Sequence, residues 1–215
     1  MATGDIPRPT VQRLSLYLRA LDQAVAASKS TISSSTIAST FGLTDAQVRR
    51  DLACLGQTGR PGVGYQPKSL ASKIRAALSI DRTWNLIIIG VGKIGSALMG
   101  YPQFAGGGFK IVAALDADPA LHGQTVAGLR VRPLDELNEL AAAMRIDVAI
   151  LAVPADAAQD VAESVVEAGI HGILNFAPVR LKVDVPVEPI DLSRSLEQLA
   201  FNVASRDATD PETTT

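Results

Sequence analysis

Residues 84–118 read WNLIIIGVGKIGSALMGYPQFAGGGFKIVAALDAD, and this stretch decides the fold of the larger part of the chain. The apolar run at residues 86–89 predicts a strand buried on both faces of a parallel sheet. A G-x-G-x-x-G motif follows it at once, formed by Gly90, Gly92 and Gly95. Here the first glycine permits a tight turn, the second lets a pyrophosphate approach the backbone, and the third lets the next helix pack close to the sheet.

A second apolar strand, at residues 111–115, ends in Asp116, which lies 26 positions after Gly90. A carboxylate at about this spacing accepts hydrogen bonds from the ribose of a dinucleotide, and its charge repels a 2′-phosphate. The backbone amides at the helix start face the anion. These amides belong to Val91, Lys93 and Ile94. We therefore expect a site for NAD(H) rather than NADP(H), with a Rossmann-like fold whose pocket is empty or repurposed as the alternative.

Beyond residue 118, short apolar strands alternate with helical segments, and this alternation predicts a doubly wound parallel sheet of the α/β class. In such sheets a ligand lies at the carboxyl ends of the strands. The residues at two of these ends are Val153, Pro154, Asn175, Phe176, Ala177 and Pro178. Together with the glycine turn and Asp116, these residues are expected to line the nucleotide pocket.

The first 82 residues predict a winged helix. Apolar spacing indicates a helix at 11–27, a short helix at 36–41 and, after a glycine, a third helix at 44–55. The last two form a helix-turn-helix whose second helix can enter a major groove. Residues 56–65 hold four glycines and a proline around Arg60, which indicates a wing on the minor groove or the backbone. An ordinary helical hairpin is the alternative.

The candidate DNA contacts lie on these elements and on the linking helix expected at 67–77, where polar and basic side chains can reach base edges and phosphates. They are Thr44, Gln47, Arg49, Arg50, Arg60, Gly62, Tyr65 and Lys68. The charge of the chain supports this interpretation, because residues 1–82 hold 11 Lys or Arg against 5 Asp or Glu, whereas residues 83–215 hold 9 against 17. Such an asymmetry indicates that the first part meets a polyanion.

Four parts follow from these patterns. We expect a winged-helix domain with a linking helix at 1–82, a Rossmann-like nucleotide-binding domain at 83–192, a carboxyl-terminal helix at 193–204 and a disordered tail at 205–215. The apolar face of the terminal helix needs a surface to bury against, either in its own domain or in a partner subunit.

Several classes of protein fit the sequence poorly. No apolar run reaches the roughly 18 residues of a membrane span and no signal peptide is evident, so we expect a cytoplasmic protein without a membrane partner. The lone Cys54 cannot form an internal disulfide or, alone, a metal site. We expect structural roles for His122 and His171. Only 40 residues follow Asn175, which are too few for a substrate domain. We expect no catalytic residues and a sensor rather than an enzyme.

The chain resembles the Rex family of redox-sensing transcriptional repressors over nearly its whole length. The matching stretches are LYLRAL, QVRRDL, GVGY, VGKIGSALMGYPQF, LDADP and AGIHGILNFAPV. The resemblance implies a homodimer that binds operator DNA through its winged helices and NAD(H) through its Rossmann-like domains, with the last helix exchanged between subunits. It also implies repression of respiratory or fermentative genes when NADH is scarce.

The resemblance also implies roles for single residues. Tyr101 and Asp191 match positions that act as a switch near the nicotinamide, and Arg19 matches the residue that pairs with that acid when the dimer rearranges. The wing departs from the family pattern, because Pro61 stands where an arginine usually precedes GVGY and Arg60 lies one place earlier. The sequence thus predicts a repressor that NADH releases from a palindromic operator. A small NAD-dependent oxidoreductase with a basic amino-terminal domain, or a regulator that answers another nucleotide, is the alternative.

Overall fold

A computed structural model describes residues 6–56, 59–60 and 62–207 of the chain. The chain forms two compact units, Met1–Thr83 and Trp84–Thr215, and each is considered by itself. The predicted fold class, a winged helix followed by a doubly wound α/β sheet, is confirmed. Among the described residues, no helix is both long enough and apolar enough to cross a bilayer.

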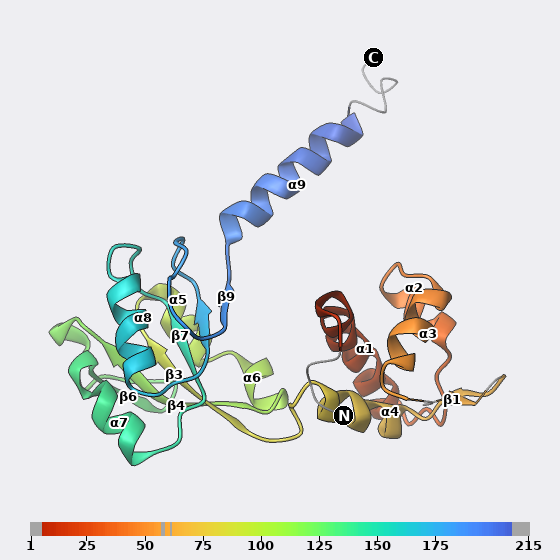
Figure 1. Cartoon of the computed structure of the whole chain (residues 1–215), viewed down its shortest axis with the longest axis horizontal. Helices are drawn as coiled ribbons and strands as arrows, with labels where there is room; N and C mark the ends of the chain where they lie inside the picture. The colour runs from red at the N-terminus through yellow and green to blue at the C-terminus, as the bar shows by residue number, and fades with distance from the viewer. Residues whose placement is uncertain (1–5, 57–58, 61, 208–215) are drawn as a thin grey trace. The chain divides into compact units, whose positions relative to one another are not determined.

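The first unit is a bundle of helices with a small hairpin (Figure 1). Its elements are α1 (Arg8–Ala26), α2 (Ser34–Thr40), α3 (Asp45–Ala53), β1 (Gly59–Arg60), β2 (Gly64–Tyr65) and α4 (Pro67–Ala77). All four helices contribute fully buried apolar side chains to one core, among them Leu14, Leu21, Ile37, Leu52 and Ile74. Ser33 caps α2 and Thr44 caps α3, since each hydroxyl accepts a hydrogen bond from a backbone N–H three residues later.

The hairpin is anchored to the helical part by its second strand. Ile32 and Tyr65 exchange two backbone hydrogen bonds of 2.9 and 2.8 Å and so form an isolated antiparallel bridge beside β2. Gly64, the residue before Tyr65, has φ of +92°, and a Cβ atom there would lie 2.6 Å from the carbonyl oxygen of Ile32. Only glycine fits this close approach of two backbones.

The second unit is a seven-stranded sheet of order β5-β6-β4-β3-β7-β8-β9, parallel except for the edge pair of β5 and β6. Its strands are β3 (Trp84–Ile89), β4 (Phe109–Asp116), β5 (Thr125–Val126), β6 (Leu129–Pro133), β7 (Val148–Leu151), β8 (Ile173–Asn175) and β9 (Val187–Pro189). The chain moves outward from β3 through β4 to β6, then returns to β7 and moves out on the other side. The topological switch point, where ligands bind in such sheets, therefore lies between β3 and β7.

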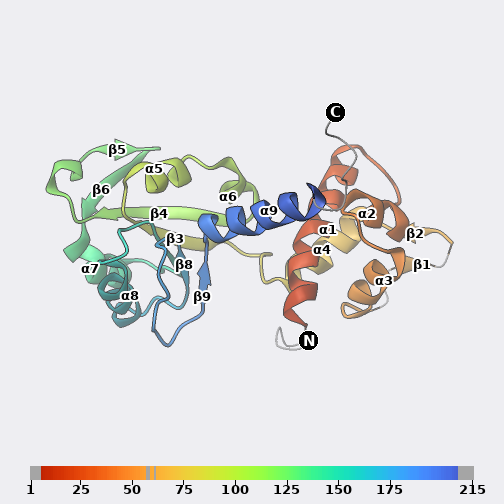
Figure 2. The same cartoon turned by 90° about the horizontal axis from the view of Figure 1, so that it is seen from above.

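Helices cover both faces of this sheet. They are α5 (Lys93–Met99), α6 (Pro102–Gly106), α7 (Leu137–Ala143) and α8 (Ala158–Glu167), with 3-10 turns η2 (Pro119–Leu121) and η3 (Leu134–Glu136). Alternate residues of β3 enter two separate cores, Ile87 and Ile89 on one face and Leu86 and Ile88 on the other. Figure 2 shows α7 and α8 on the first of these faces and α5 and α6 on the second.

The last helix, α9 (Leu192–Asp207), differs from the expected range of 193–204. The sequence predicts that the tail begins at residue 205, but the helix continues to Asp207, and residues 208–215 lie outside the described part of the chain. Ser205 and Arg206 are polar but do not break a helix, and the hydroxyl of Ser205 donates a 2.8 Å hydrogen bond to the carbonyl of Phe201. Polarity alone was therefore a poor guide to where this helix ends.

Candidate nucleotide site and nucleic-acid interface

The glycine turn after β3 contains Gly90, Gly92 and Gly95, which differ in the space around them. Gly90 has φ of +91°, and a Cβ there would lie 2.5 Å from the carbonyl oxygen of Ala152, which follows β7. A Cβ on Gly95 would overlap the carbonyl oxygen of Gly90, so this glycine lets α5 pack against the turn. Gly92 differs, because nothing lies within 4 Å of the place where its Cβ would be. The turn is thus closed toward the sheet and open at the middle glycine.

Asp116, the last residue of β4, is joined to this turn. One carboxylate oxygen accepts a 2.6 Å hydrogen bond from the N–H of Val91, and the other accepts a 2.8 Å bond from the N–H of Asp118. A carboxylate has about four acceptor positions, so two remain for further donors such as ribose hydroxyls. Val153 comes to the same place, with its Cγ1 3.1 Å from the Cβ position of Gly90. The structure therefore brings together the turn, the acid and the end of β7.

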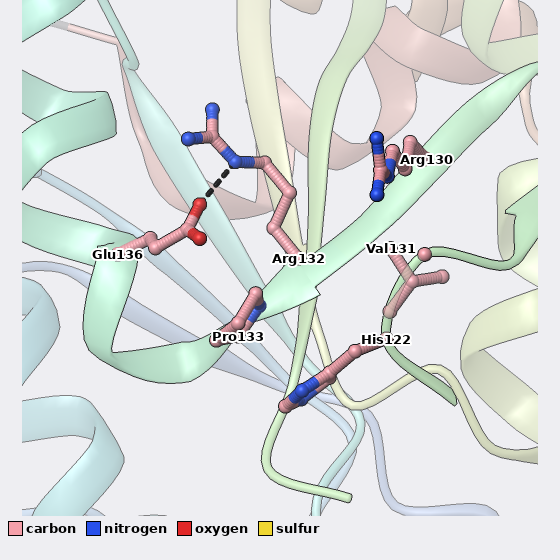
Figure 3. Close-up of a pocket in the computed structure, with 7 residues that line it drawn as sticks. His122, Arg130, Val131, Arg132, Pro133 and Glu136 are labelled. Carbon is pink, nitrogen blue, oxygen red and sulfur yellow. Dashed lines mark hydrogen bonds and ion pairs between the residues drawn. The ribbon is translucent and has the colours of Figure 1, made fainter. Parts of the chain in front are cut away.

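Next to Asp116 lies a pocket of about 570 Å³ (Figure 3). It is lined by His122, Gly123, Arg130, Val131, Arg132, Pro133 and Glu136. Pro133 is the register partner of Asp116, and the Nε2 atom of His122 lies 2.9 Å from the Asp116 carbonyl oxygen, which gives this histidine a structural contact. In Figure 3 the guanidinium of Arg132 points to Glu136, with which it forms an ion pair.

The sequence patterns do not indicate these residues as a pocket. The signal was present in LRVRP, because Arg130 and Arg132 are two apart on a strand and must point to the same face. That alternation is common on edge strands and does not by itself indicate a site. The pocket depends on the pairing of β6 with the end of β4, which the sequence alone does not show.

The remaining predicted pocket residues differ in exposure. Val91 and Ala177 are buried, Val153 and Phe176 are half-buried, and Lys93, Ile94, Pro154 and Pro178 are exposed. Asn175 is 1% exposed and its side chain is used within its own loop. Its Nδ2 donates to the carbonyls of Ala177 and Val179 at 3.1 and 2.9 Å, and its Oδ1 accepts from the N–H of Ala177 at 3.0 Å. Asn175 therefore shapes the loop after β8 rather than presenting a free amide.

The three predicted switch residues lie on separate elements. Tyr101 precedes α6, is 48% exposed and makes an edge-to-face contact with Phe104, with ring centroids 5.2 Å apart. Asp191 immediately precedes α9, and its carboxylate accepts a 2.9 Å hydrogen bond from the N–H of Arg194 in the first turn of that helix. Arg19 is exposed on α1, in the other unit. Their predicted interaction belongs to a dimer and stays a prediction.

The predicted DNA contacts divide into structural and open positions. Thr44 is the cap of α3, its hydroxyl accepting from the N–H of Gln47 at 3.2 Å. Tyr65 is half-buried against the hairpin, and burial raises the pKa of its hydroxyl. Arg49 forms an ion pair with Asp45 on the same helix. The open positions are Arg50 and Lys68, which are exposed and have no hydrogen-bond or ion-pair partner among the described residues, and Gly62. The side chain of Arg60, and Pro61, lie outside the described part.

Asp51, a residue that the sequence patterns do not single out, has the largest number of side-chain hydrogen bonds among the described acids of the first unit. It lies on α3, is 2% exposed, and its carboxylate receives hydrogen bonds from two helices. Arg13 of α1 donates to both oxygens at 2.6 and 2.8 Å, and Tyr17 of α1 donates to Oδ2 at 2.7 Å. Thr10 and Gln47 donate to Oδ1 at 3.1 and 3.0 Å.

These contacts determine the charge of Asp51. Burial alone would raise its pKa, but the hydrogen bonds from Arg13, Tyr17 and Gln47 and the charge of Arg13 outweigh burial and lower the pKa to about 2. The same cluster raises the pKa of Tyr17, through burial and its bond to Asp51, so this hydroxyl stays a donor. The sequence held a weak signal, since Asp51 shares a helix face with Val48, Leu52 and Leu55.

Two family models match the chain, the "CoA binding domain" at residues 81–179 and the "Putative DNA-binding protein N-terminus" at residues 5–53. The redox-sensing transcriptional repressor Rex of Rhodopirellula baltica is 43% identical over 205 residues, which cover 94% of this chain and 86% of that protein. The Rex protein of Syntrophomonas wolfei is also 43% identical, over 95% of this chain and 98% of its own length.

Solved structures agree with these relatives. A Rex-family repressor, RSP, in complex with β-NAD⁺ and operator DNA matches with a TM-score of 0.89 and 33% identity, covering 97% of this chain and 99% of that one. RSP in complex with β-NADH matches with a TM-score of 0.84 and 32% identity, covering 95% and 97%. A sequence identity of 43% over nearly the whole length shows more than a shared fold. The chain therefore belongs to the Rex family of redox-sensing transcriptional repressors.

Proposed function

We propose that this protein represses transcription by binding palindromic operator DNA and that NADH releases it, so that it reports the ratio of NADH to NAD⁺. One observation carries the proposal: a glycine turn joined to Asp116 follows, in the same chain, a unit with a capped helix-turn-helix. Relatives with this architecture are named repressors, and RSP has been solved with operator DNA and with each form of the dinucleotide. In this proposal the protein is not an enzyme and acts in the cytoplasm, where it meets both DNA and NADH.

The nucleotide side of the proposal rests on the fit of the turn. Gly92 leaves open space at the start of α5, where backbone N–H groups favour a pyrophosphate. Asp116 retains acceptor positions for the ribose of the adenosine and, being anionic, disfavours a 2′-phosphate. The bound dinucleotide would supply the redox signal, because its nicotinamide ring carries a charge only in the oxidised form.

The DNA side of the proposal rests on side chains of α3 and of the start of α4. Arg50 and Lys68 are exposed cations without a partner among the described residues, which suits contacts with phosphate. Gln47, near the amino-terminal end of α3, suits a base edge, because the first turns of a recognition helix lie deepest in the major groove. Binding that depends on such cations falls steeply with salt.

We further propose that two copies form the working repressor. Every described side chain of α9 is exposed, including Leu192, Leu196, Leu199, Phe201 and Val203, at 52–72%. A helix of this kind requires a partner surface, and the family resemblance favours exchange of α9 between subunits. A two-fold dimer matches a palindromic operator, and Arg19, Tyr101 and Asp191 are then the proposed switch.

The decisive experiment titrates NADH, and separately NAD⁺, into a complex of the protein with fluorescent operator DNA at fixed moderate salt. We expect NADH to release the DNA at a concentration where NAD⁺ does not. By linkage, operator DNA must weaken NADH binding by the same factor. Binding that neither dinucleotide changes would leave a repressor with another signal. Hydride transfer to a small carbonyl substrate, lost on mutation of the pocket, would instead favour an oxidoreductase.

A further inference from the structure

The buried carboxylate of Asp51, on α3, is hydrogen-bonded to side chains of α1 and of α3 itself. Arg13 and Tyr17, both on α1, hold its two oxygens at 2.6 to 2.8 Å. On its own helix, one turn earlier, the Nε2 of Gln47 donates to Oδ1 at 3.0 Å. The carboxylate is thus held by α1 and also contacts Gln47, a side chain of the proposed DNA-binding surface.

The chemistry of this contact determines how the amide of Gln47 is turned. An ionised carboxylate only accepts hydrogen bonds, so the amide must direct an N–H, and not its oxygen, toward Asp51. The low pKa of Asp51, about 2, keeps it ionised at any pH at which the protein would bind DNA. No described residue donates to Oε1 of Gln47, and this half-buried side chain has no enclosed unpaired atom. Oε1 and the second N–H of the amide remain available.

We propose that Asp51 is a positioning residue for sequence recognition: it orients the carboxamide of Gln47 so that an acceptor and a donor, side by side, face the major groove. That pair is complementary to the edge of adenine, where the N6 amino group donates and N7 accepts. A freely rotating glutamine could present the reverse order and would read bases less sharply. This inference rests on the proposed function, since it requires a helix that reads DNA.

The test begins by selecting palindromic duplexes from random-sequence DNA with the wild-type full-length protein. Each adenine of the selected half-site is then replaced by 7-deazaadenine, which removes the N7 acceptor, and the affinity is measured at fixed salt. We expect one adenine per half-site whose replacement weakens the wild type about tenfold. Gln47→Ala should bind both duplexes alike, and Asp51→Asn should lose most of the discrimination at that adenine alone.

Thr10→Val is the matched control. Thr10 donates to the same Oδ1 atom of Asp51 at 3.1 Å, but it lies on α1 and touches no candidate DNA contact. A purely structural role for the cluster predicts that Thr10→Val and Asp51→Asn weaken all duplexes together. A positioning role predicts that only Asp51→Asn changes the ratio at one adenine, and that Asp51→Asn adds nothing further in a Gln47→Ala background.

Asp51→Asn leaves Arg13 without its partner and can fail to fold. Arg13→Met combined with Asp51→Asn removes both charges and keeps the test available. NADH affinity, which belongs to the other unit, reports that each variant is intact in that part. Full adenine discrimination by Asp51→Asn or by the double variant would overturn the inference. If the wild type selects no sequence at all, the proposed function itself fails, which is a different outcome.

Discussion

The two units each contain one acid that organises its surroundings, and the two acids are treated in opposite ways. Asp51 is 2% exposed and receives hydrogen bonds from four side chains, so its acceptor capacity is filled by the protein. Asp116 is half-buried at the end of a strand, and among the described residues its carboxylate accepts hydrogen bonds from two backbone N–H groups. A saturated acid stabilises and orients its own unit, whereas an acid with free acceptor positions can hold a ligand.

The largest effect should come from removing the cation beside the saturated acid. Arg13→Ala leaves Asp51 buried and ionised without its ion pair, which should lower the free energy of unfolding of the first unit by about 3 kcal/mol or more. Urea unfolding followed by circular dichroism measures this. Arg75→Ala is the control, because its ion pair with Asp22 is exposed and worth about 1 kcal/mol at most. Equal losses in the two variants would contradict the contrast between the acids.

The open acid should instead affect ligand binding. Asp116→Ala removes acceptors for the ribose and the bond to the Val91 N–H, so we expect NADH affinity to fall by about 2 to 3 kcal/mol, measured by NADH fluorescence. Asp118→Ala is the control, since its side chain accepts only from the N–H of Ala120, away from the turn. Unchanged NADH affinity in Asp116→Ala would point to a regulator of another nucleotide.

At low pH the free energy of unfolding should depend on the titration of Asp51, because its pKa is lowered in the folded protein. The pKa of Asp51 is about 2 in the folded protein and 3.8 without its partners, so its contribution to stability is complete above about pH 5 and is lost as the pH falls toward 2. The loss amounts to about 2 kcal/mol. Unfolding free energies of the wild type and Asp51→Asn measured across this range isolate it, since only the wild type carries this titration. Parallel curves for the two proteins would refute the assignment.

The smallest effect concerns a side chain outside both clusters. Arg50→Ala should weaken operator and non-specific DNA several-fold alike, and should reduce the slope of log affinity against log salt by about one, if Arg50 contacts one phosphate. Lys110→Ala removes an exposed cation from the other unit and should leave the slope unchanged. A selective loss of operator binding in Arg50→Ala would assign it to a base instead.

The sequence predicted the open acid and missed the saturated one for a physical reason. The glycine turn and Asp116 belong to one strand-helix-strand unit whose spacing is fixed by local geometry, so the motif carries the information. Asp51 contacts Arg13 and Tyr17 across 38 and 34 positions of sequence. Within QVRRDL an acid resembles solvated surface charge, and only tertiary packing shows that it faces α1.

Other differences have the same origin. Asn175 lies at a strand end, as predicted. The sequence does not show that its amide is used to shape its own loop. Tyr65 similarly combines a predicted DNA contact with a half-buried place at the base of the hairpin. Sequence patterns identify which residues reach a region. They do not show how many hydrogen bonds each residue has already made there.

The bond between Asp116 and the Val91 N–H has a consequence for how a redox sensor would respond. The acid is already held in place by the backbone, so binding of the adenosine half needs little loss of side-chain entropy. That half is chemically identical in NADH and NAD⁺, so it contributes equally to the binding of both forms. The oxidised form then competes for the site as a natural antagonist. Where the two forms together saturate the site, the fraction of protein that holds NADH would follow the ratio of NADH to NAD⁺ and not the size of the total pool.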